Sequence, residues 1–329
     1  MRAPEFWTSD SAAAKACAIL LAPLGALYGL SVVARAARAH PFRPKARVLC
    51  AGNLTVGGSG KTPVAIALGS KLAARGLKIV FLSRGYGGRV HGPVRVDRAR
   101  HCAADIGDEP LLLAAHGETI VAGNRAAGAR LADSLGADVI VMDDGFQNFQ
   151  LAKDLALVVI DAAAGFGNGR LVPAGPLRER VAQGLARADA IVLMGEGTPE
   201  LPAFAGPILR AHLVPAAPET FAGRKLFAFA GIGRPDKFFQ MLRAIGANVV
   251  GAQSFPDHHR FDAAELSALK KTADKTGAQL VTTEKDFVRL DPLARKNVLS
   301  IPVHAVFSDE RALALLLDKL GEHRNVAKR

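Results

Sequence analysis

Cysteine and aromatic residues are both scarce in this chain. Its 329 residues include three cysteines, Cys17, Cys50 and Cys102, and no two of them form a C-x-x-C pair. This argues against a disulfide framework and against a zinc site, and it is typical of proteins from a reducing compartment. Aromatic residues make up 6% of the chain, and no basic run is interleaved with them. Single-strand binders need such a stacking surface, so we expect no nucleic-acid partner.

Acidic residues are also fewer than basic ones, with 30 Asp and Glu against 42 Lys and Arg, and the net charge is +12. This excess predicts an anionic partner, such as an acidic membrane surface or a phosphorylated substrate. Half of the residues are apolar and 22% are charged, which is typical of a globular chain. The length suits one large or two ordinary α/β domains, and the sequence has no internal repeat or low-complexity segment.

An uncharged apolar stretch covers residues 16–34, between Lys15 and Arg35. Its length is close to the roughly 20 residues that span a bilayer. A basic flank follows at once, and such a flank favours the cytoplasmic side for the rest of the chain; its members are Arg35, Arg38, Arg43, Lys45 and Arg47. We predict a membrane-associated helix in residues 1–40 that crosses the bilayer or lies in its surface. A buried core helix and a cleaved signal peptide are the alternatives.

A glycine-rich stretch, TVGGSGKTPV, covers residues 55–64. It follows the short apolar run 47–51 and opens a helical pattern that continues to Arg75, which is the layout of a phosphate-binding loop. Its glycines let backbone N–H groups surround phosphate oxygens beside the positive end of the helix dipole. Lys61 would reach the β- and γ-phosphates, and the Thr62 hydroxyl would hold Mg²⁺.

The match to the motif G-x-x-x-x-G-K-[ST] is imperfect, because Thr55 stands in place of the first glycine. An ordinary glycine-rich turn before a helix is therefore the alternative. We nevertheless predict ATP as the ligand of this loop, contacted by Thr55, Val56, Gly57, Gly58, Ser59, Gly60, Lys61 and Thr62.

Apolar runs alternate with helical stretches along the body of the chain, which predicts a mainly parallel sheet covered by helices on both faces. The runs in the first part are 47–51, 77–83, 137–142, 155–160 and 188–194, and the helical stretches include 110–116 and 124–135. After a proline-rich passage at 199–218, a second series has strands at 225–230, 248–252, 279–283 and 304–307, with helices near 235–245, 263–275 and 310–320. We expect a P-loop NTPase-like α/β core over residues 41–220 and a smaller C-terminal α/β domain over 221–329.

Acidic residues stand at two places where a phosphate site needs them. Asp143 and Asp144 follow an apolar run directly, and acids at the carboxyl end of a strand suit Mg²⁺, although Asp-Asp-Gly is also an ordinary turn. Asp108 and Glu109 come just before a predicted helix. Together they would supply a base for an attacking hydroxyl and an acid near the metal, while a helix N-cap is the alternative for Asp108.

The sequence FPDHHRF at 255–261 groups two histidines with an acid and an arginine. The absence of a cysteine or a third spaced histidine argues against a zinc site, so the loop offers either an acid–base histidine or a polar surface. Arg178 is a candidate for stabilising charge on a transferring phosphoryl group, and Arg84 is a candidate for binding an anionic substrate group. A surface salt bridge is the alternative for both arginines.

Taken together, these motifs resemble those of the tetraacyldisaccharide 4'-kinase family, the lipid A 4'-kinases. The blocks follow the family's order and cover about residues 47–290: GNLTVGGSGKTP (52–63), SRGYGG (83–88), GDEP (107–110), DDGFQ (143–147), GNGR (167–170) with PAGPLRE (173–179), FPDHH (255–259) and TEKD (283–286).

The resemblance implies transfer of the ATP γ-phosphate to the 4'-hydroxyl of a tetraacylated disaccharide 1-phosphate, at the cytoplasmic face of the inner membrane. The phosphorylated lipid and the membrane surface are then the partners, and no obligate protein partner is expected. It also implies that Asp108 acts as base with a histidine, His258 rather than His259. Glu109 and Asp144 become Mg²⁺ candidates beside Asp143, and Arg178 a phosphate contact.

One residue departs from the family's pattern, because Asn148 stands where a histidine commonly follows DDGFQ. Asn can form hydrogen bonds but cannot carry a proton at neutral pH, so any role of that imidazole is open here.

Two other functional classes share part of the pattern. One is a membrane-associated P-loop ATPase of the partition or transport type, which carries a signature lysine where this chain has Val56. The other is a non-catalytic scaffold switched by nucleotide.

Overall fold

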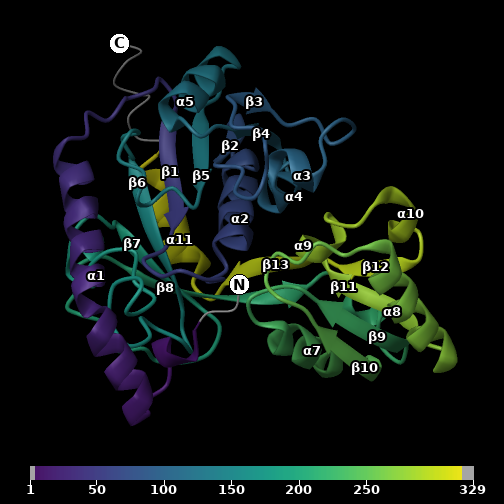
Figure 1. Ribbon diagram of the computed structural model, residues 1–329. Coiled ribbons are helices and arrows are strands. Elements are labelled where there is room, and N and C mark those ends of the chain that lie inside the picture. The colour runs from purple at the N-terminus through teal and green to yellow at the C-terminus, as the bar shows by residue number, and fades with distance from the viewer. Residues whose placement is uncertain (1–3, 321–329) are drawn as a thin grey trace.

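The computed structural model describes residues 4–320 and contains two β-sheets with helices packed around them (Figure 1). The large sheet has nine strands in the order β13-β8-β7-β6-β1-β5-β2-β4-β3. In chain order these strands are β1 (Arg47–Gly52), β2 (Ile79–Ser83), β3 (Val94–Arg95), β4 (Glu118–Val121), β5 (Val139–Asp143), β6 (Leu155–Asp161), β7 (Ala190–Met194), β8 (Ile208–Pro215) and β13 (Val303–Phe307). All neighbours pair in parallel except β13 with β8 and β3 with β4.

Helices cover both faces of the large sheet, so its central strands are buried and apolar. One face packs against α2 (Lys61–Ala73) and α11 (Glu310–Asp318), and the other against α5 (Arg125–Ser134) and α6 (Val181–Leu185). Strand β1 lies between β5 and β6, and its register places Ala51 opposite Asp143 of β5. The carboxyl ends of these strands therefore meet at one edge, where α/β sheets bind ligands.

The small sheet has the order β10-β9-β11-β12, and its strands are all parallel. They are β9 (Lys225–Ala230), β10 (Asn248–Ser254), β11 (Gln279–Thr283) and β12 (Val298–Ile301). Helix α7 (Pro235–Ala244) covers one face, and α8 (Ala263–Lys275) and α10 (Pro292–Arg295) the other. Two short helices, α4 (Asp108–Leu113) and α9 (Glu284–Phe287), contact each other where the two parts of the molecule meet (Figure 1). Helix α3 (Ala103–Ile106) lies beside α4.

These observations confirm the predicted fold class, a mainly parallel sheet with a smaller α/β unit and an N-terminal apolar helix. Each predicted strand has its counterpart, but β3, β4, β8 and β12 were not predicted. The strand at 304–307 was placed wrongly in the second series, because β13 pairs with β8 of the large sheet. Helix α11 follows it and packs against α2, where Lys71 contacts Glu310 at 2.6 Å and Arg75 contacts Asp318 at 2.8 Å. A domain boundary near residue 220 stays a proposal, with β13 and α11 returning to the large sheet.

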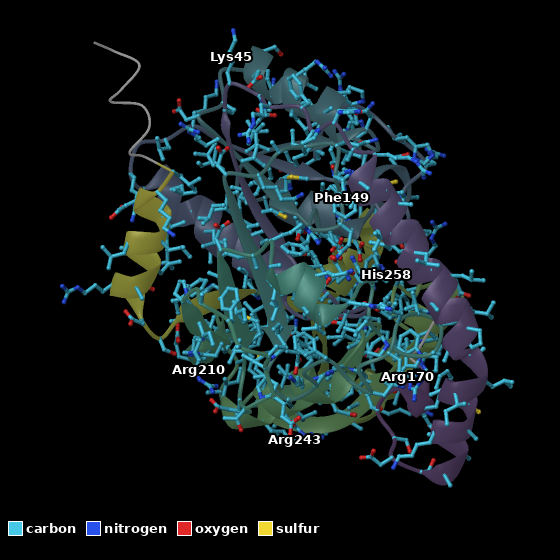
Figure 2. The ribbon with its side chains drawn as sticks, turned by 90° about the vertical axis from the view of Figure 1, so that its left-hand side faces the viewer. Lys45, Phe149, Arg170, Arg210, Arg243 and His258 are labelled. Carbon is cyan, nitrogen blue, oxygen red and sulfur yellow. The ribbon has the colours of Figure 1, made fainter. Side chains whose placement is uncertain are left out.

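Helix α1 (Ala12–Ala37) lies along the outside of the molecule (Figures 1 and 2). It is long and apolar enough to cross a membrane, and 17% of its most apolar window is buried, so it is not a core helix. Small residues face the body: an added Cβ on Gly25 would lie 3.1 Å from the Leu171 carbonyl oxygen. The opposite side exposes large apolar side chains to solvent, those of Ile19, Leu20, Leu24, Leu27, Leu30 and Val33.

Candidate active site

The predicted phosphate loop lies between β1 and the N-terminus of α2, at the carboxyl edge of the large sheet. Gly57 and Gly60 have φ angles of 119° and 84°, which L-residues with side chains rarely adopt. An added Cβ on Gly57 or Gly58 would meet nothing within 4 Å. The loop therefore presents an open backbone face at a helix N-terminus, which is the form of an anion site.

Buried hydrogen bonds hold the loop in this shape. Asn53 Nδ2 donates to Ser59 Oγ at 3.1 Å, and both residues are buried. The Val56 N–H donates to the Pro176 carbonyl at 2.8 Å, and Thr55 forms an isolated bridge with Leu177. The segment before Arg178 is thus fixed against the loop.

Three predicted residues meet at the base of the loop. Thr62 Oγ1 donates to Asp143 Oδ2 at 2.8 Å, and the side chain of Lys61 is largely buried nearby. Asp143 is buried, and its Oδ1 has no hydrogen-bond partner among residues 4–320. Burial, followed by the negative charge of Glu109, raises the pKa of Asp143 to about 7. A buried carboxylate with one unpartnered oxygen is a position where a positive ion would be strongly stabilised.

This donor set fits Mg²⁺, which prefers oxygen ligands and keeps several waters. A hydroxyl and a carboxylate lie together, and one carboxylate oxygen is unpartnered. No group of three His, Cys, Asp or Glu side chains that would hold a metal occurs in the part of the chain that the structure describes. A magnesium ion here would therefore need phosphate oxygens among its ligands, as at other triphosphate sites.

Asp144 directly follows β5 and has a positive φ of 52°. Its carboxylate contacts Lys61 Nζ at 3.8 Å and accepts a hydrogen bond from Arg178 Nη1 at 2.8 Å. Burial favours the neutral acid, but Lys61 and then Arg178 outweigh it and lower the pKa of Asp144. Two cations thus converge beside the phosphate loop, which suits the stabilisation of anionic oxygens.

Asp108 lies in the first turn of α4, and Gly107 occupies the N-cap position. Its Oδ1 accepts from the N–H of Glu109 at 3.1 Å. The N-cap of α4 is Gly107, which has no side chain, so the predicted alternative of Asp108 as an N-cap is not what the structure shows. Asp108 Oδ2 faces three cationic or titratable groups: His258 Nδ1 at 3.3 Å, Lys285 Nζ at 3.9 Å and the Arg289 guanidinium. Burial opposes ionisation of Asp108, but these groups outweigh it and hold its pKa well below the usual range.

Of the two predicted histidines, only His258 contacts Asp108. It has a φ of 59°, its N–H donates to the Gly231 carbonyl at 3.1 Å, and its ring packs edge-on against Tyr86. His259 instead contacts the Glu265 carboxylate at 2.9 Å and stacks on Phe255. The two histidines therefore have different partners: His258 contacts Asp108, whereas His259 contacts residues of the small unit.

Glu109, predicted as a metal ligand, contacts Lys285 Nζ at 3.4 Å. Lys285 and Arg289 were assigned no role from the sequence, although the TEKD block includes the first of them. Their position after β11 was the available signal, because residues at the carboxyl end of a parallel strand line the ligand-binding edge. The structure brings both of them to Asp108 across the boundary between the two units.

The side chain of Arg84, predicted as an anion contact, is exposed. Its positive charge acts on the guanidinium of Arg125, at the start of α5. Arg125 is 2% exposed, and its Nε has no partner among residues 4–320. Burial and then the charge of Arg84 lower the pKa of Arg125 to about 10. Arg125 Nη1 donates to the Ala122 carbonyl, and the charges of Asp144 and Asp143 act on the guanidinium as well. No sequence pattern pointed to Arg125.

Asn148, the departure from the family pattern, lies in the turn after Asp144. Its Oδ1 accepts from the Gln150 N–H at 3.1 Å, and its carbonyl accepts from Lys153 Nζ at 2.6 Å. Neighbouring Gln147 donates to the Asn53 carbonyl at 2.7 Å, which links this turn to the phosphate loop. Asn148 thus serves the turn itself through its side-chain oxygen.

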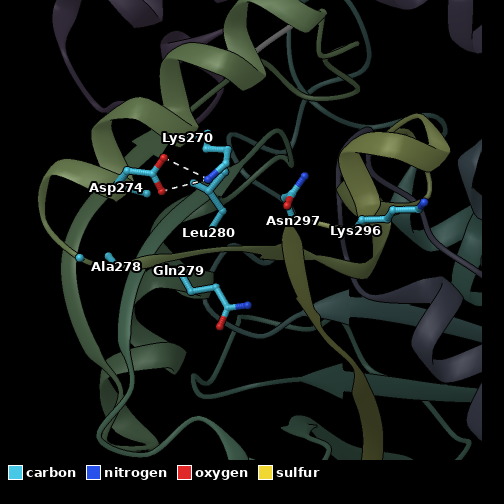
Figure 3. A pocket seen from close by; sticks show the side chains of 9 residues that line it. Lys270, Asp274, Ala278, Gln279, Leu280, Lys296 and Asn297 are labelled. Atoms are coloured by element: carbon cyan, nitrogen blue, oxygen red, sulfur yellow. Dashed lines mark hydrogen bonds and ion pairs between the residues drawn. The ribbon is translucent and has the colours of Figure 1, made fainter.

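A separate hollow of about 330 Å³ lies on the small unit, away from these residues (Figure 3). Lys270 and Asp274 on its rim pair with each other at 3.0 Å, and none of the predicted site residues lines it. It therefore has no part in the candidate active site.

Comparisons with known proteins agree with the motifs. The family described as "Tetraacyldisaccharide-1-P 4'-kinase" matches residues 17–321. The tetraacyldisaccharide 4'-kinase of Parvibaculum lavamentivorans is 49% identical over 333 residues, covering 97% of each chain. That of Paramagnetospirillum magneticum is 50% identical over 327 residues, covering 98% of this chain and 99% of the other. The fold is similar to an "apo" form of Aquifex aeolicus LpxK in complex with ATP, at a TM-score of 0.74 and 27% identity over 92% of this chain and 99% of that one.

Proposed function

The chain belongs to the tetraacyldisaccharide 4'-kinase family, and from this premise we propose the reaction and the residues that perform it. The substrate is a tetraacylated disaccharide 1-phosphate, the donor is ATP, and the reaction is a late step of lipid A biosynthesis. One observation carries this proposal: the phosphate loop lies close to the segment of the small unit that carries His258. A Cβ on Gly233 would lie 3.8 Å from the Gly58 nitrogen and 3.7 Å from the Asp257 carboxylate, next to His258.

The transfer needs little covalent chemistry from the protein. The 4'-hydroxyl oxygen bonds to the γ-phosphorus, the bond from that phosphorus to the β–γ bridging oxygen breaks, and ADP leaves. The hydroxyl proton passes to the pair formed by Asp108 and His258, whose atoms lie 3.3 Å apart. Lys61 and Arg178, which both contact Asp144, stabilise the charge on the phosphoryl oxygens.

We assign Mg²⁺ to Thr62 and Asp143, because this pair leaves an unpartnered carboxylate oxygen. When bound, the ion would neutralise charge on the β- and γ-phosphates. Glu109 and Asp144 remain proposed neighbours of the ion, and both carboxylates are paired with cations in this structure. The eight loop residues from Thr55 to Thr62 supply the N–H groups and side chains that hold the triphosphate.

The positive charge of the protein and the apolar helix α1 support the assignment of its lipid substrate and of its location. The exposed apolar side of α1 would lie against acyl chains, followed directly by a basic flank that includes Arg35 and Arg38. Arg84 and Arg125 would bind an anionic group of the substrate. We place the protein at the cytoplasmic face of the inner membrane, where ATP and the lipid meet, and we expect neither nucleic acid nor an obligate protein partner.

Turnover of the lipid separates this function from its rivals. Purified protein, Mg-ATP and tetraacyl disaccharide 1-phosphate are incubated in detergent micelles, and the lipid mass is measured. Gain of one phosphate, lost in Lys61→Ala with an unchanged melting temperature, is the expected result. ATP hydrolysis that a protein partner stimulates and the lipid does not would instead favour a partition-type ATPase. ATP binding without any turnover would favour a scaffold.

A further inference from the structure

Arg289 is the most fully engaged charged side chain in the site. It is 5% exposed and donates from Nε to Asp108 Oδ2 at 3.0 Å, and Nη2 donates to the same oxygen. Nη1 donates to Asp286 Oδ1 at 2.7 Å and to the Gly231 carbonyl at 2.9 Å. Nη2 also lies 3.4 Å from His258 Nδ1. A single planar guanidinium therefore contacts both members of the acid–base pair.

The small unit holds this guanidinium rigidly. Asp286 is fully buried and accepts from the Gly231 N–H at 3.0 Å and from Thr283 Oγ1 at 2.8 Å. The Gly231 carbonyl accepts in turn from the His258 N–H and from Arg289. His258 and Arg289 thus share one backbone anchor, so the histidine ring and the guanidinium are fixed relative to each other.

Asp108 belongs to the other unit, 181 residues away in sequence from Arg289. The two bonds from Arg289 fix the position of Asp108 Oδ2, which lies 3.3 Å from His258 Nδ1. Lys285 approaches the same oxygen only to 3.9 Å and is more exposed. A lysine ammonium is a point charge, whereas the guanidinium fork fixes direction as well as distance.

We infer that Arg289 is a positioning residue that sets Asp108 and His258 in reacting geometry across the boundary between the two units. This inference rests on the proposed function, in which that pair accepts the hydroxyl proton. In this assignment Arg289 contacts neither ATP nor the lipid and acts through the carboxylate and the imidazole that it holds. A displacement of about 1 Å at such a pair lowers the rate by roughly 100-fold.

The test compares Arg289→Lys and Arg289→Ala with Arg295→Lys as a matched control. Arg295 lies in the same unit, donates to the backbone carbonyls of Phe287 and Val288, and lies 5.7 Å from the centroid of the Phe287 ring. For each variant kcat, the KM values for ATP and lipid, the melting temperature and rescue of turnover by added guanidinium are measured. We expect Arg289→Lys to lose about 100-fold in kcat with KM values within about threefold of the wild type, and guanidinium to restore part of the Arg289→Ala turnover.

A purely structural role predicts a different pattern, in which ATP affinity and melting temperature fall with kcat and guanidinium restores nothing. Folded Arg289→Lys with wild-type kcat would overturn the inference. If Arg289→Ala does not fold, Arg289→Lys alone decides, and its unfolding relative to Arg295→Lys would also count against a positioning role. Asp108→Asn and His258→Gln are measured in parallel. Wild-type turnover in those two would overturn the proposed acid–base pair, whereas their loss beside an active Arg289→Lys would overturn the positioning role alone.

Discussion

Replacing Asp108 by Asn is the sharpest test of the acid–base pair, because the amide has the carboxylate's shape without its charge. In the native protein Asp108 Oδ2 accepts from Arg289 and contacts His258 Nδ1 at 3.3 Å. Asn retains one acceptor oxygen for the arginine but cannot take a proton at neutral pH. The variant therefore separates packing at this position from proton transfer.

The expected loss of kcat is about 100- to 10,000-fold, the usual contribution of a positioned general base. The free energy of unfolding should fall by less than is usual when one partner of a buried ion pair is removed. Removing one partner of a buried ion pair typically costs about 3–5 kcal/mol, because the other charge is left unpaired. Arg289 keeps Asp286 at 2.7 Å and the Gly231 carbonyl at 2.9 Å. We therefore expect a loss of about 2 kcal/mol, near that of one hydrogen bond to a charged group.

The assay measures lipid phosphorylation at saturating Mg-ATP, with ATP affinity and thermal unfolding recorded on the same preparations. Asp105→Asn is the control, because Asp105 lies three residues earlier, pairs with Arg89 and does not contact His258. Wild-type kcat in folded Asp108→Asn would show that Asp108 is not the base. A loss of ATP affinity as large as the loss of kcat would mean that Asp108 supports the nucleotide site rather than the proton transfer.

Two further predictions concern the loop and the boundary between the units. Gly60→Ala should lower ATP affinity about tenfold in a binding titration, because Gly60 has a φ of 84° and the added methyl would lie 3.2 Å from Met194 Cε. Gly76→Ala is the control: Gly76 has a φ of 81° and no atom within 4 Å of an added Cβ, so ATP affinity should stay unchanged. Asp161→Asn should lose about 1–2 kcal/mol of unfolding free energy at pH 7, because the Asp161 carboxylate contacts Lys237 Nζ at 3.0 Å and Arg234 Nη1 at 2.8 Å. Burial is outweighed by the neighbouring cations, which lower the pKa of Asp161. The stabilisation by its carboxylate is therefore complete above the unfolded pKa near 4 and is lost as the pH falls through the folded pKa, so chemical denaturation should show the stabilities of variant and wild type converging in acid. A stability difference that stays constant down to pH 2 would contradict this reasoning.

The half of the site that the sequence predicted is local in the chain. The stretch from Gly57 to Thr62 is contiguous, and its spacing alone requires a turn followed by a helix. Asp143 could be added because a strand end places its acid at the same sheet edge as the loop, and the register of β5 against β1 shows this. Local pattern and the geometry of parallel sheets together were sufficient here.

The other half depends on contacts between distant segments. Arg289 and Lys285 meet the GDEP helix from 181 and 176 residues away, and no local pattern encodes that meeting. Strand β8 was missed because prolines at both ends made its stretch resemble a linker. Strand β13 was assigned to the wrong sheet because an apolar run does not specify which edge it joins; its antiparallel pairing with β8 does.

In the mechanism we propose, the two units divide the reaction between them. The large sheet carries the phosphate loop, Asp143 and Asp108, whereas the small sheet carries His258 and Arg289. In this proposal the nucleotide is held by residues of one unit, whereas the proposed acid–base pair forms only where the two units meet. Ion pairs of Asp108 with Arg289 and of Asp161 with Arg234 lie at that meeting point, and both place the cation on the small unit. Any change that separates the units should then lower kcat before it lowers ATP affinity, because a proton acceptor split across a boundary is lost first.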